Sequence, residues 1–305
     1  MKTILITGSN GLLGQKLVHL LALQSEFKWV ATARGHNRVH LPQPFEFASM
    51  DITNPTQIQE VFAHYKPDIL IHTAAMTQVD ECEKDHKNCI LQNVTAVRYL
   101  VEVAEKYKTF FIHLSTDFIF DGSAGPYTEE ATPNPISFYG NSKWEAEKII
   151  QNSSLSWAIA RTVLVYGVAQ DMSRSNIILW VKKSLEEGKK IKVVDDQWRT
   201  PTLAEDLAKG CLLIAQKQAQ GIFNISGKDF LTPYQMALAT AEFFGLDKNL
   251  IERVDSNTFT QPARRPPRTG FIIEKARKTL GYEPHSFQEG LAIVAEQLSQ
   301  MQDKI

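Results

Sequence analysis

The first fourteen residues constrain the fold of this chain more than any other stretch. Lys2 to Thr7 is an apolar run with the length of a buried strand, and Gly8-Ser9-Asn10-Gly11-Leu12-Leu13-Gly14 follows it directly. A helical pattern then continues to about Leu23. A strand, a glycine-rich turn and a helix in this order predict the first unit of a dinucleotide-binding sheet. A plain glycine-rich loop is the alternative, and the flanking strand and helix favour the cofactor site.

The residues of this turn have distinct expected roles. Gly8 permits the tight turn, Gly11 lets a pyrophosphate approach the backbone, and Gly14 lets the helix pack closely on the strand. The phosphates would meet the free N–H groups at the positive end of the helix. We therefore expect cofactor contacts from Gly8, Asn10, Gly11, Leu12 and Gly14.

Strand and helix patterns alternate after this unit. We expect strands at 29–33, 45–50, 68–72, 109–114 and 157–167, and helices at 55–65 and 85–107. Asn54 is the expected N-cap and Pro55 the first residue of the helix at 55–65. The alternation predicts an α/β fold, a Rossmann-type doubly wound parallel sheet with helices on both faces. Ligands of such sheets bind at the carboxyl ends of the strands.

Two short segments at those strand ends bear on the cofactor. Arg34 stands about twenty residues after the glycine turn, where an NAD site would carry an acidic residue. An arginine favours a 2′-phosphate, so NADP(H) is favoured and NAD(H) stays possible; a solvated basic loop is the alternative. Ala74 and Ala75 follow the strand at 68–72, and their small side chains would let the chain pass a nicotinamide ribose. Simple tight packing competes with that interpretation.

Tyr139 and Lys143 are one helical turn apart and share a helix face. A free phenol titrates near ~10. A neighbouring ammonium favours the phenolate, so we expect a lowered pKa for Tyr139 and proton transfer near neutral pH. Such pairs also arise by chance on solvated helices. Thr116, in Ser115-Thr116-Asp117 at the end of the fifth strand, is the expected polar partner that would orient a carbonyl, although these hydroxyls can also cap the strand.

The regular alternation weakens after Gly167. We divide the chain into a cofactor-binding domain at 1–167 and a smaller, less regular substrate-binding domain at 168–305, with segments at about 195–226 returning to the first. Helices are expected at 173–188, 203–217, 232–244, 273–280 and 286–301, and short strands at 191–194, 221–226 and 250–254. The basic, proline-rich loop at 262–268 is expected to be exposed. Its arginines, Arg265 among them, are candidates to clamp a diphosphate, and a solvated loop is equally compatible.

Composition excludes several other classes. The chain carries 33 basic and 34 acidic residues, a net charge of −1, and no apolar run long enough to cross a membrane. We expect no nucleic-acid or membrane partner and a cytoplasmic, reducing location. Cys82, Cys89 and Cys211 are expected to be packing thiols, and we expect no metal site.

In combination, the glycine pattern at 8–14, Ser-Thr-Asp at 115–117 and Tyr-x-x-x-Lys at 139–143 resemble the extended short-chain dehydrogenase/reductase family. Within it the chain is most similar to the dTDP-4-dehydrorhamnose reductase branch, through residues 68–80, 115–122, 161–167 and 265–266. The resemblance implies NAD(P)H-dependent reduction of the C4 carbonyl of a nucleotide-diphospho-4-keto-6-deoxysugar. It implies that Tyr139 donates the proton, Lys143 lowers its pKa and binds the nicotinamide ribose, and Thr116 orients the carbonyl. Asp51 and Ile52 would lie against the adenine, and Asp117, Leu164 and Arg265 would contact the substrate.

Two departures from that branch fall on the substrate side. Its segment at 161–167 normally carries a tryptophan where this chain has Leu164, and its loop Asp-Gln-x-Gly-x-Pro-Thr appears as 196–202 without the glycine. Both leave the expected reaction intact and put the particular sugar in question. The alternatives are a sugar-nucleotide epimerase or dehydratase, or a non-catalytic NADP-binding regulatory subunit like that of methionine adenosyltransferase. A homodimer is possible.

Overall fold

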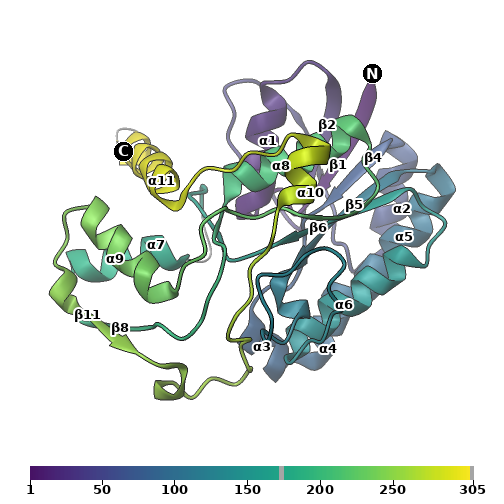
Figure 1. The fold of residues 1–305 in the computed structure, drawn as a ribbon. Coiled ribbons are helices and arrows are strands. Elements are labelled where there is room, and N and C mark those ends of the chain that lie inside the picture. Colours follow the sequence, from purple (N-terminus) through teal and green to yellow (C-terminus); the bar gives the residue numbers. More distant parts are fainter. Residues whose placement is uncertain (172–174, 303–305) are drawn as a thin grey trace.

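The centre of the molecule is a parallel sheet of seven strands (Figure 1). The computed structural model describes residues 1–171 and 175–302. In spatial order the strands are β10 (Gly221–Asn224), β6 (Trp157–Thr162), β5 (Phe110–Thr116), β4 (Ile69–His72), β1 (Lys2–Thr7), β2 (Phe27–Ala33) and β3 (Glu46–Ser49). All six neighbouring pairs are parallel, which confirms the predicted α/β fold. The order reverses between β1 and β4, where such sheets form their binding crevice.

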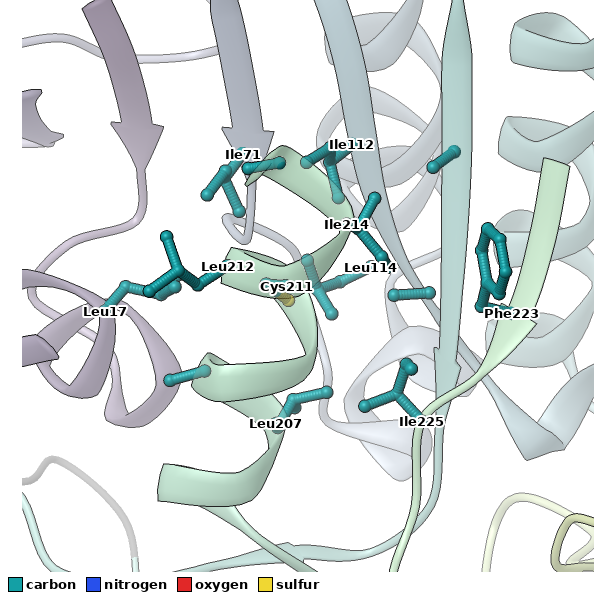
Figure 2. Packing of buried hydrophobic residues seen from close by; sticks show 14 of the residues in the cluster. Leu17, Ile71, Ile112, Leu114, Leu207, Cys211, Leu212, Ile214, Phe223 and Ile225 are labelled. Carbon is teal, nitrogen blue, oxygen red and sulfur yellow. The ribbon is translucent and has the colours of Figure 1, made fainter. Parts of the chain in front are cut away.

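Helices cover both faces of this sheet because successive strand residues point to opposite sides. Ile4 and Ile6 of β1 share a core with α1 (Leu12–Ala22), α8 (Ala204–Lys217) and α10 (Glu274–Leu280). Leu5, between them, packs with α2 (Pro55–Tyr65), α5 (Ala96–Tyr107) and α6 (Phe138–Gln151). Figure 2 shows Ile214 of α8 beside Ile112 and Leu114 of β5, Leu212 beside Leu17 of α1, and Cys211 between them. Cys211 is therefore a packing residue, as expected.

The long helix expected at 85–107 is interrupted. The chain forms α3 (Val79–Lys84), which was not predicted, then α4 (His86–Ile90), a π-helical turn (Leu91–Thr95) and α5. The wider π turn adds a residue to the helix, and it carries Asn93 into the interior. There the Asn93 amide accepts a hydrogen bond from Met76 N (2.8 Å) and donates one to Met76 O (3.0 Å). The interruption thus fixes the segment that follows β4.

The strand expected at 157–167 is also broken. β6 ends at Thr162, and Leu164 has a φ of 39°, a left-handed conformation that turns the chain out of the sheet. Val165–Tyr166 then forms β7, which pairs with β9 (Thr202–Leu203) in a small separate sheet. The hydroxyl of Thr202 donates a hydrogen bond to Val163 O (2.7 Å) and holds this corner.

The second half builds a smaller group of elements beside the large sheet (Figure 1). α7 (Ile177–Glu186) and α9 (Pro233–Phe243) pack on the parallel pair β8 (Ile191–Val194) and β11 (Ile251–Val254), and α11 (Phe287–Gln302) closes the chain. Short 3₁₀ helices lie at Asp117–Ile119, Lys248–Leu250 and Ser256–Thr258. Residues 173 and 174 of the helix expected at 173–188 lie outside the described residues. Across the described chain, no helix is long and apolar enough to cross a membrane.

Candidate active site

A cavity of about 900 Å³ opens at the carboxyl edge of the large sheet. Elements of both halves of the chain line it, from the glycine turn to the loop at 262–268. Apart from Arg264 and Arg268 of the loop at 262–268, every residue that the sequence nominates for the cofactor and the substrate lies on its wall: Gly8, Asn10, Gly11, Leu12, Gly14, Arg34, Asp51, Ile52, Ala74, Ala75, Thr116, Asp117, Tyr139, Lys143, Leu164 and Arg265. The structure brings these residues together, and their individual roles stay predictions.

The glycine turn has the close packing that a dinucleotide cradle requires. Gly8 has a φ of 71°, and a Cβ built on it would lie 2.8 Å from Ala74 N. A Cβ on Gly14 would lie 2.2 Å from Gly8 O, so the helix can approach the strand only through a glycine. The hydroxyl of Ser9 is buried with no hydrogen-bond partner within the described chain. These observations fit a phosphate-binding turn at the start of α1.

The loop after β2 is held by the glycine turn. The side chain of Asn10 donates to His36 O (2.8 Å) and accepts from Arg38 N (2.9 Å). This contact places exposed Arg34 and half-buried Arg38 at the cavity. Arg38 is not among the residues expected from the sequence. Its basic side chain, four residues after Arg34, was the available signal.

The Asp51 carboxylate forms hydrogen bonds within its own turn. It accepts hydrogen bonds from the Thr53 backbone N–H (2.9 Å) and hydroxyl (2.7 Å), which fixes the turn after β3. Ile52 is buried beside this turn and lines the cavity. An apolar side chain with a rigid turn next to it gives a flat contact for a nucleotide base.

Tyr139 and Thr116 meet at the end of β5. The Thr116 hydroxyl accepts from Phe118 N (3.2 Å) and lies 3.2 Å from Asp117 Oδ1, so it caps the 3₁₀ turn as the alternative interpretation anticipated. It also neighbours Tyr139, and this interaction lowers the pKa of the phenol. Burial is the larger effect and raises the pKa of Tyr139 well above its usual range. The lowered pKa expected from the sequence is therefore wrong for this structure, because desolvation outweighs the favourable contact.

Lys143 is buried on the same helix, at 3% exposure. Burial lowers its pKa to about 8, with a partial opposing effect from the Glu147 carboxylate. Its Nζ lies 3.2 Å from Nε2 of His113, a buried residue of β5. Burial, together with the Lys143 charge, holds the pKa of His113 well below its ordinary value. His113 is not among the residues expected from the sequence, and its place on the strand three residues before Thr116 was the available signal.

The start of α6 is fixed from several directions. Ser137 caps the helix by accepting from Gly140 N (3.1 Å), and a Cβ on Gly140 would lie 2.2 Å from Phe118 O. The buried amide of Asn93 donates to the Ser142 hydroxyl (3.0 Å), which joins α6 to the π-helical turn. These contacts hold Tyr139 against the end of β5. Asn93 and Ser142 are supporting residues that the sequence did not reveal.

The polar side chains on the part of the cavity wall that the sequence assigns to the substrate are paired with one another. Arg199, which occupies the position of the missing glycine in the loop at 196–202, is buried, and its guanidinium donates to Pro266 O (2.7 Å). It lies 3.8 Å from Asp117, and burial raises the pKa of that carboxyl despite the nearby charge. Arg265 is held by both Asp80 oxygens (3.1 and 2.6 Å).

The loop at 262–268 is therefore only partly exposed, contrary to the sequence-based prediction. Arg264 and Arg268 are exposed, whereas Ala263 and Pro266 are buried against the site. Part of the loop is buried because Arg199 and Asp80, which lie far away in the chain, form hydrogen bonds with it. Within residues 1–171 and 175–302, no group of three or more His, Cys, Asp or Glu could hold a metal ion.

This arrangement defines a class of protein. A glycine-turn cradle and a buried Tyr-x-x-x-Lys helix face one cavity at the switch point of a parallel sheet. That combination is characteristic of extended short-chain dehydrogenases/reductases, which act on substrates beside a nicotinamide cofactor.

Comparisons with known proteins agree with this class and narrow it. The model of the RmlD substrate binding domain matches residues 1–300, and the chain belongs to this family of extended short-chain dehydrogenases/reductases. It is 31% identical to methionine adenosyltransferase 2 subunit beta of Xenopus tropicalis, over 79% of this chain and 72% of that protein. It is 27% identical to dTDP-4-dehydrorhamnose reductase of Aggregatibacter actinomycetemcomitans, over 95% and 97%. The crystal structure of a dTDP-4-dehydrorhamnose reductase from Bacillus anthracis in complex with NADP superposes with a TM-score of 0.83, at 26% identity and over 97% and 100% of the two chains.

Proposed function

We propose that the protein reduces the C4 carbonyl of a nucleotide-diphospho-4-keto-6-deoxysugar with NADPH, and that dTDP-4-dehydrorhamnose is its foremost candidate substrate. The observation that carries the proposal is the meeting of Thr116, Tyr139 and Lys143 on the wall of the cavity that the glycine turn also lines. The similarity to dTDP-4-dehydrorhamnose reductases supports the same reaction.

The glycine turn, Ala74 and Ala75 would hold the dinucleotide, which supplies the hydride. Tyr139 stays protonated at neutral pH because burial raises its pKa, so its O–H is available to donate to a carbonyl oxygen. Thr116 lies beside the phenol and would orient the substrate carbonyl toward it. Lys143 places a buried positive charge on the same helix face, which stabilises negative charge as it develops on the phenolic oxygen.

The preference for NADPH is supported by charge. Arg34 and Arg38 both line the cavity, and described residues of the loop at 34–38 include no carboxylate to pair with a ribose hydroxyl. Guanidinium groups suit a 2′-phosphate. The NADP in the Bacillus anthracis structure is consistent with this preference.

A turnover screen tests the proposal. Purified protein would be mixed with NADPH or NADH and a panel of nucleotide-linked 4-ketosugars, and absorbance of the reduced cofactor would be followed. We expect oxidation of NADPH that depends on the ketosugar. Product formation without net NADPH consumption would instead identify an epimerase or dehydratase, which regenerates its cofactor in each cycle.

A second candidate is a non-catalytic, NADP-binding regulatory subunit. The 31% identity to methionine adenosyltransferase 2 subunit beta favours it. The presence of Thr116, Tyr139 and Lys143 together on the cavity wall favours the reductase. Tight NADPH binding with no turnover of any ketosugar, together with co-purification of a methionine adenosyltransferase, would establish the regulatory role.

A further inference from the structure

Lys143 has an unusual partner for a buried ammonium. The described contacts place its Nζ 3.2 Å from the His113 ring, and both side chains are at most 3% exposed. His113 lies on β5, three residues before Thr116, and so reaches Lys143 from the sheet. Glu147, one turn further along α6, contributes charge but is itself bound by Arg161.

The chemistry of this contact fixes the state of the imidazole. An ammonium has three donors and no acceptor, so Nε2 of His113 must accept the hydrogen bond. The His113 proton then lies on Nδ1, which has no hydrogen-bond partner within the described chain. A neutral imidazole suits this position because burial and the Lys143 charge keep the pKa of His113 well below its ordinary value.

The surroundings keep the ring in place and neutral. His72 of β4 stacks on His113 with ring centroids 5.4 Å apart, and its Nδ1 lies 2.7 Å from the Thr7 hydroxyl. The pKa of His72 is lowered to about 3, by burial first and then by Lys143, so this ring adds no charge.

The titratable groups that face Lys143 from the other side lie on α3, α4 and α6. They are the buried Cys82 and Cys89, which with Glu147 favour its charged form, and Tyr139 at the start of its own helix.

We propose that His113 is a positioning residue for Lys143: its neutral Nε2 accepts a hydrogen bond from one ammonium N–H, which holds the amine in its charged form and leaves two N–H donors for the cavity. Nothing else in the described contacts of Lys143 provides a side-chain acceptor at hydrogen-bond distance. This inference concerns the same site as the proposed function. It rests on that function for the catalytic role of Lys143.

Two amide variants isolate the Nε2 position. The amide of His113→Gln reaches the position of Nε2, whereas that of His113→Asn ends near Nδ1 and lacks the acceptor. The readout is the pKa of Lys143, measured by NMR titration of ¹³C-labelled lysine in protein without added NADPH, with Lys143→Met to assign its signal. A lost acceptor disfavours the charged form, so we expect titration near 8 in the wild type, about one pH unit lower in His113→Asn, and near 8 in His113→Gln.

Equal pKa values in all three proteins would overturn the proposal, and so would equal shifts in both variants, which would trace the effect to ring packing. His72→Gln is the matched control, since it alters the neighbouring buried imidazole and leaves the acceptor; a shift as large as that of His113→Asn also overturns the proposal.

A measurement on the unaltered protein is independent of folding of the variants: ¹⁵N-histidine NMR should show His113 protonated at Nδ1, and protonation at Nε2 contradicts the inference.

The activity arm separates this inference from the proposed function. If the protein reduces a ketosugar, the alkaline limb of kcat/KM should move down by about one pH unit in His113→Asn and recover in His113→Gln. Absence of turnover with every ketosugar would refute the proposed function, while the lysine and histidine NMR would still decide whether His113 holds Lys143.

Discussion

Arg161 of β6 and Glu147 of α6 form a bidentate ion pair in the interior. Nε and Nη2 of the guanidinium lie 3.0 and 2.7 Å from the two carboxylate oxygens, and neither side chain is more than 1% exposed. Because Glu147 follows Lys143 by one helical turn, the pair fastens the helix that carries the site to the sheet. Arg161 also donates to Glu129 O (3.2 Å), which ties down the loop before α6.

Removing one partner of this pair should be costly, because it leaves a buried charge without compensation. We expect Arg161→Leu to lower the free energy of unfolding by about 3–5 kcal/mol, measured by urea denaturation. The double variant Arg161→Leu, Glu147→Leu should recover most of the loss. A single variant within about 1 kcal/mol of the wild type would show that the pair does not hold α6 in place.

Tyr139→Phe tests the proton donor. The variant keeps the ring in its pocket and removes the hydroxyl that contacts Thr116. We expect kcat for ketosugar reduction to fall by at least ~100-fold, with NADPH binding retained in a fluorescence titration. Near-normal turnover would remove Tyr139 from the mechanism.

Arg34→Asp tests the cofactor preference. A carboxylate in place of exposed Arg34 would repel a 2′-phosphate, so we expect the KM for NADPH to rise far more than the KM for NADH. Arg98→Asp is the matched control, an equal charge change at an exposed site on α5 that does not line the cavity. Equal effects on both cofactors would contradict the role of Arg34.

The variant Lys143→Met should be less active and more stable than the wild type. The ordinary lysine pKa of 10.5 falls to about 8 in the folded protein, so the unfolded chain binds this proton more tightly. The difference, at about 1.4 kcal/mol per pH unit, corresponds to a folding penalty of about 3–4 kcal/mol that is fully present below pH 8. The penalty fades as the pH rises from 8 to 10.5.

The variant should therefore unfold at higher urea concentration than the wild type at pH 7, and the two curves should converge above pH 10. A variant that is less stable than the wild type at pH 7 would show that the contact with His113 outweighs the cost of burial.

Arg265→Ala tests the substrate side. Asp80 holds the Arg265 guanidinium at the cavity wall, an orientation suited to a diphosphate. We expect the KM for the sugar nucleotide to rise roughly tenfold with a smaller change in kcat, and Arg265→Lys to be intermediate because lysine cannot bind bidentately. An unchanged KM would show that Arg265 only holds its loop in place through the ion pair with Asp80.

Elements whose signals are local were predictable from the sequence. The helix at 55–65 has the expected bounds, since Asn54 accepts from Thr56 N and Gln57 N and Pro55 begins the helix. The helix expected at 232–244 begins at Pro233 with a capping box made by Thr232 and Gln235. Caps depend on residues a few positions apart, which a single sequence displays.

Features that depend on distant partners were not predictable. The π-helical turn is tied to Met76 through Asn93, which lies seventeen residues later in the chain. Leu164 adopts its left-handed conformation where the chain leaves β6 for the pair β7–β9. The Lys143–His113 contact joins a helix to a strand thirty residues away. The sequence motifs therefore identified the residues of the cavity wall. The charge states of those residues could be derived only from the three-dimensional fold.

The return of β10 to the edge of the large sheet makes the two halves of the chain interdependent. β10 supplies the hydrogen-bonding partner of β6, and α8 and α10 cover the sheet face that contains Ile4 and Ile6. A fragment ending near residue 167 would carry a bare strand edge and an uncovered apolar face, both of which promote aggregation. An exchange of residues 168–305 for those of a relative must therefore join the chains at several points rather than one, because β10, α8 and α10 have to be kept to complete the large sheet.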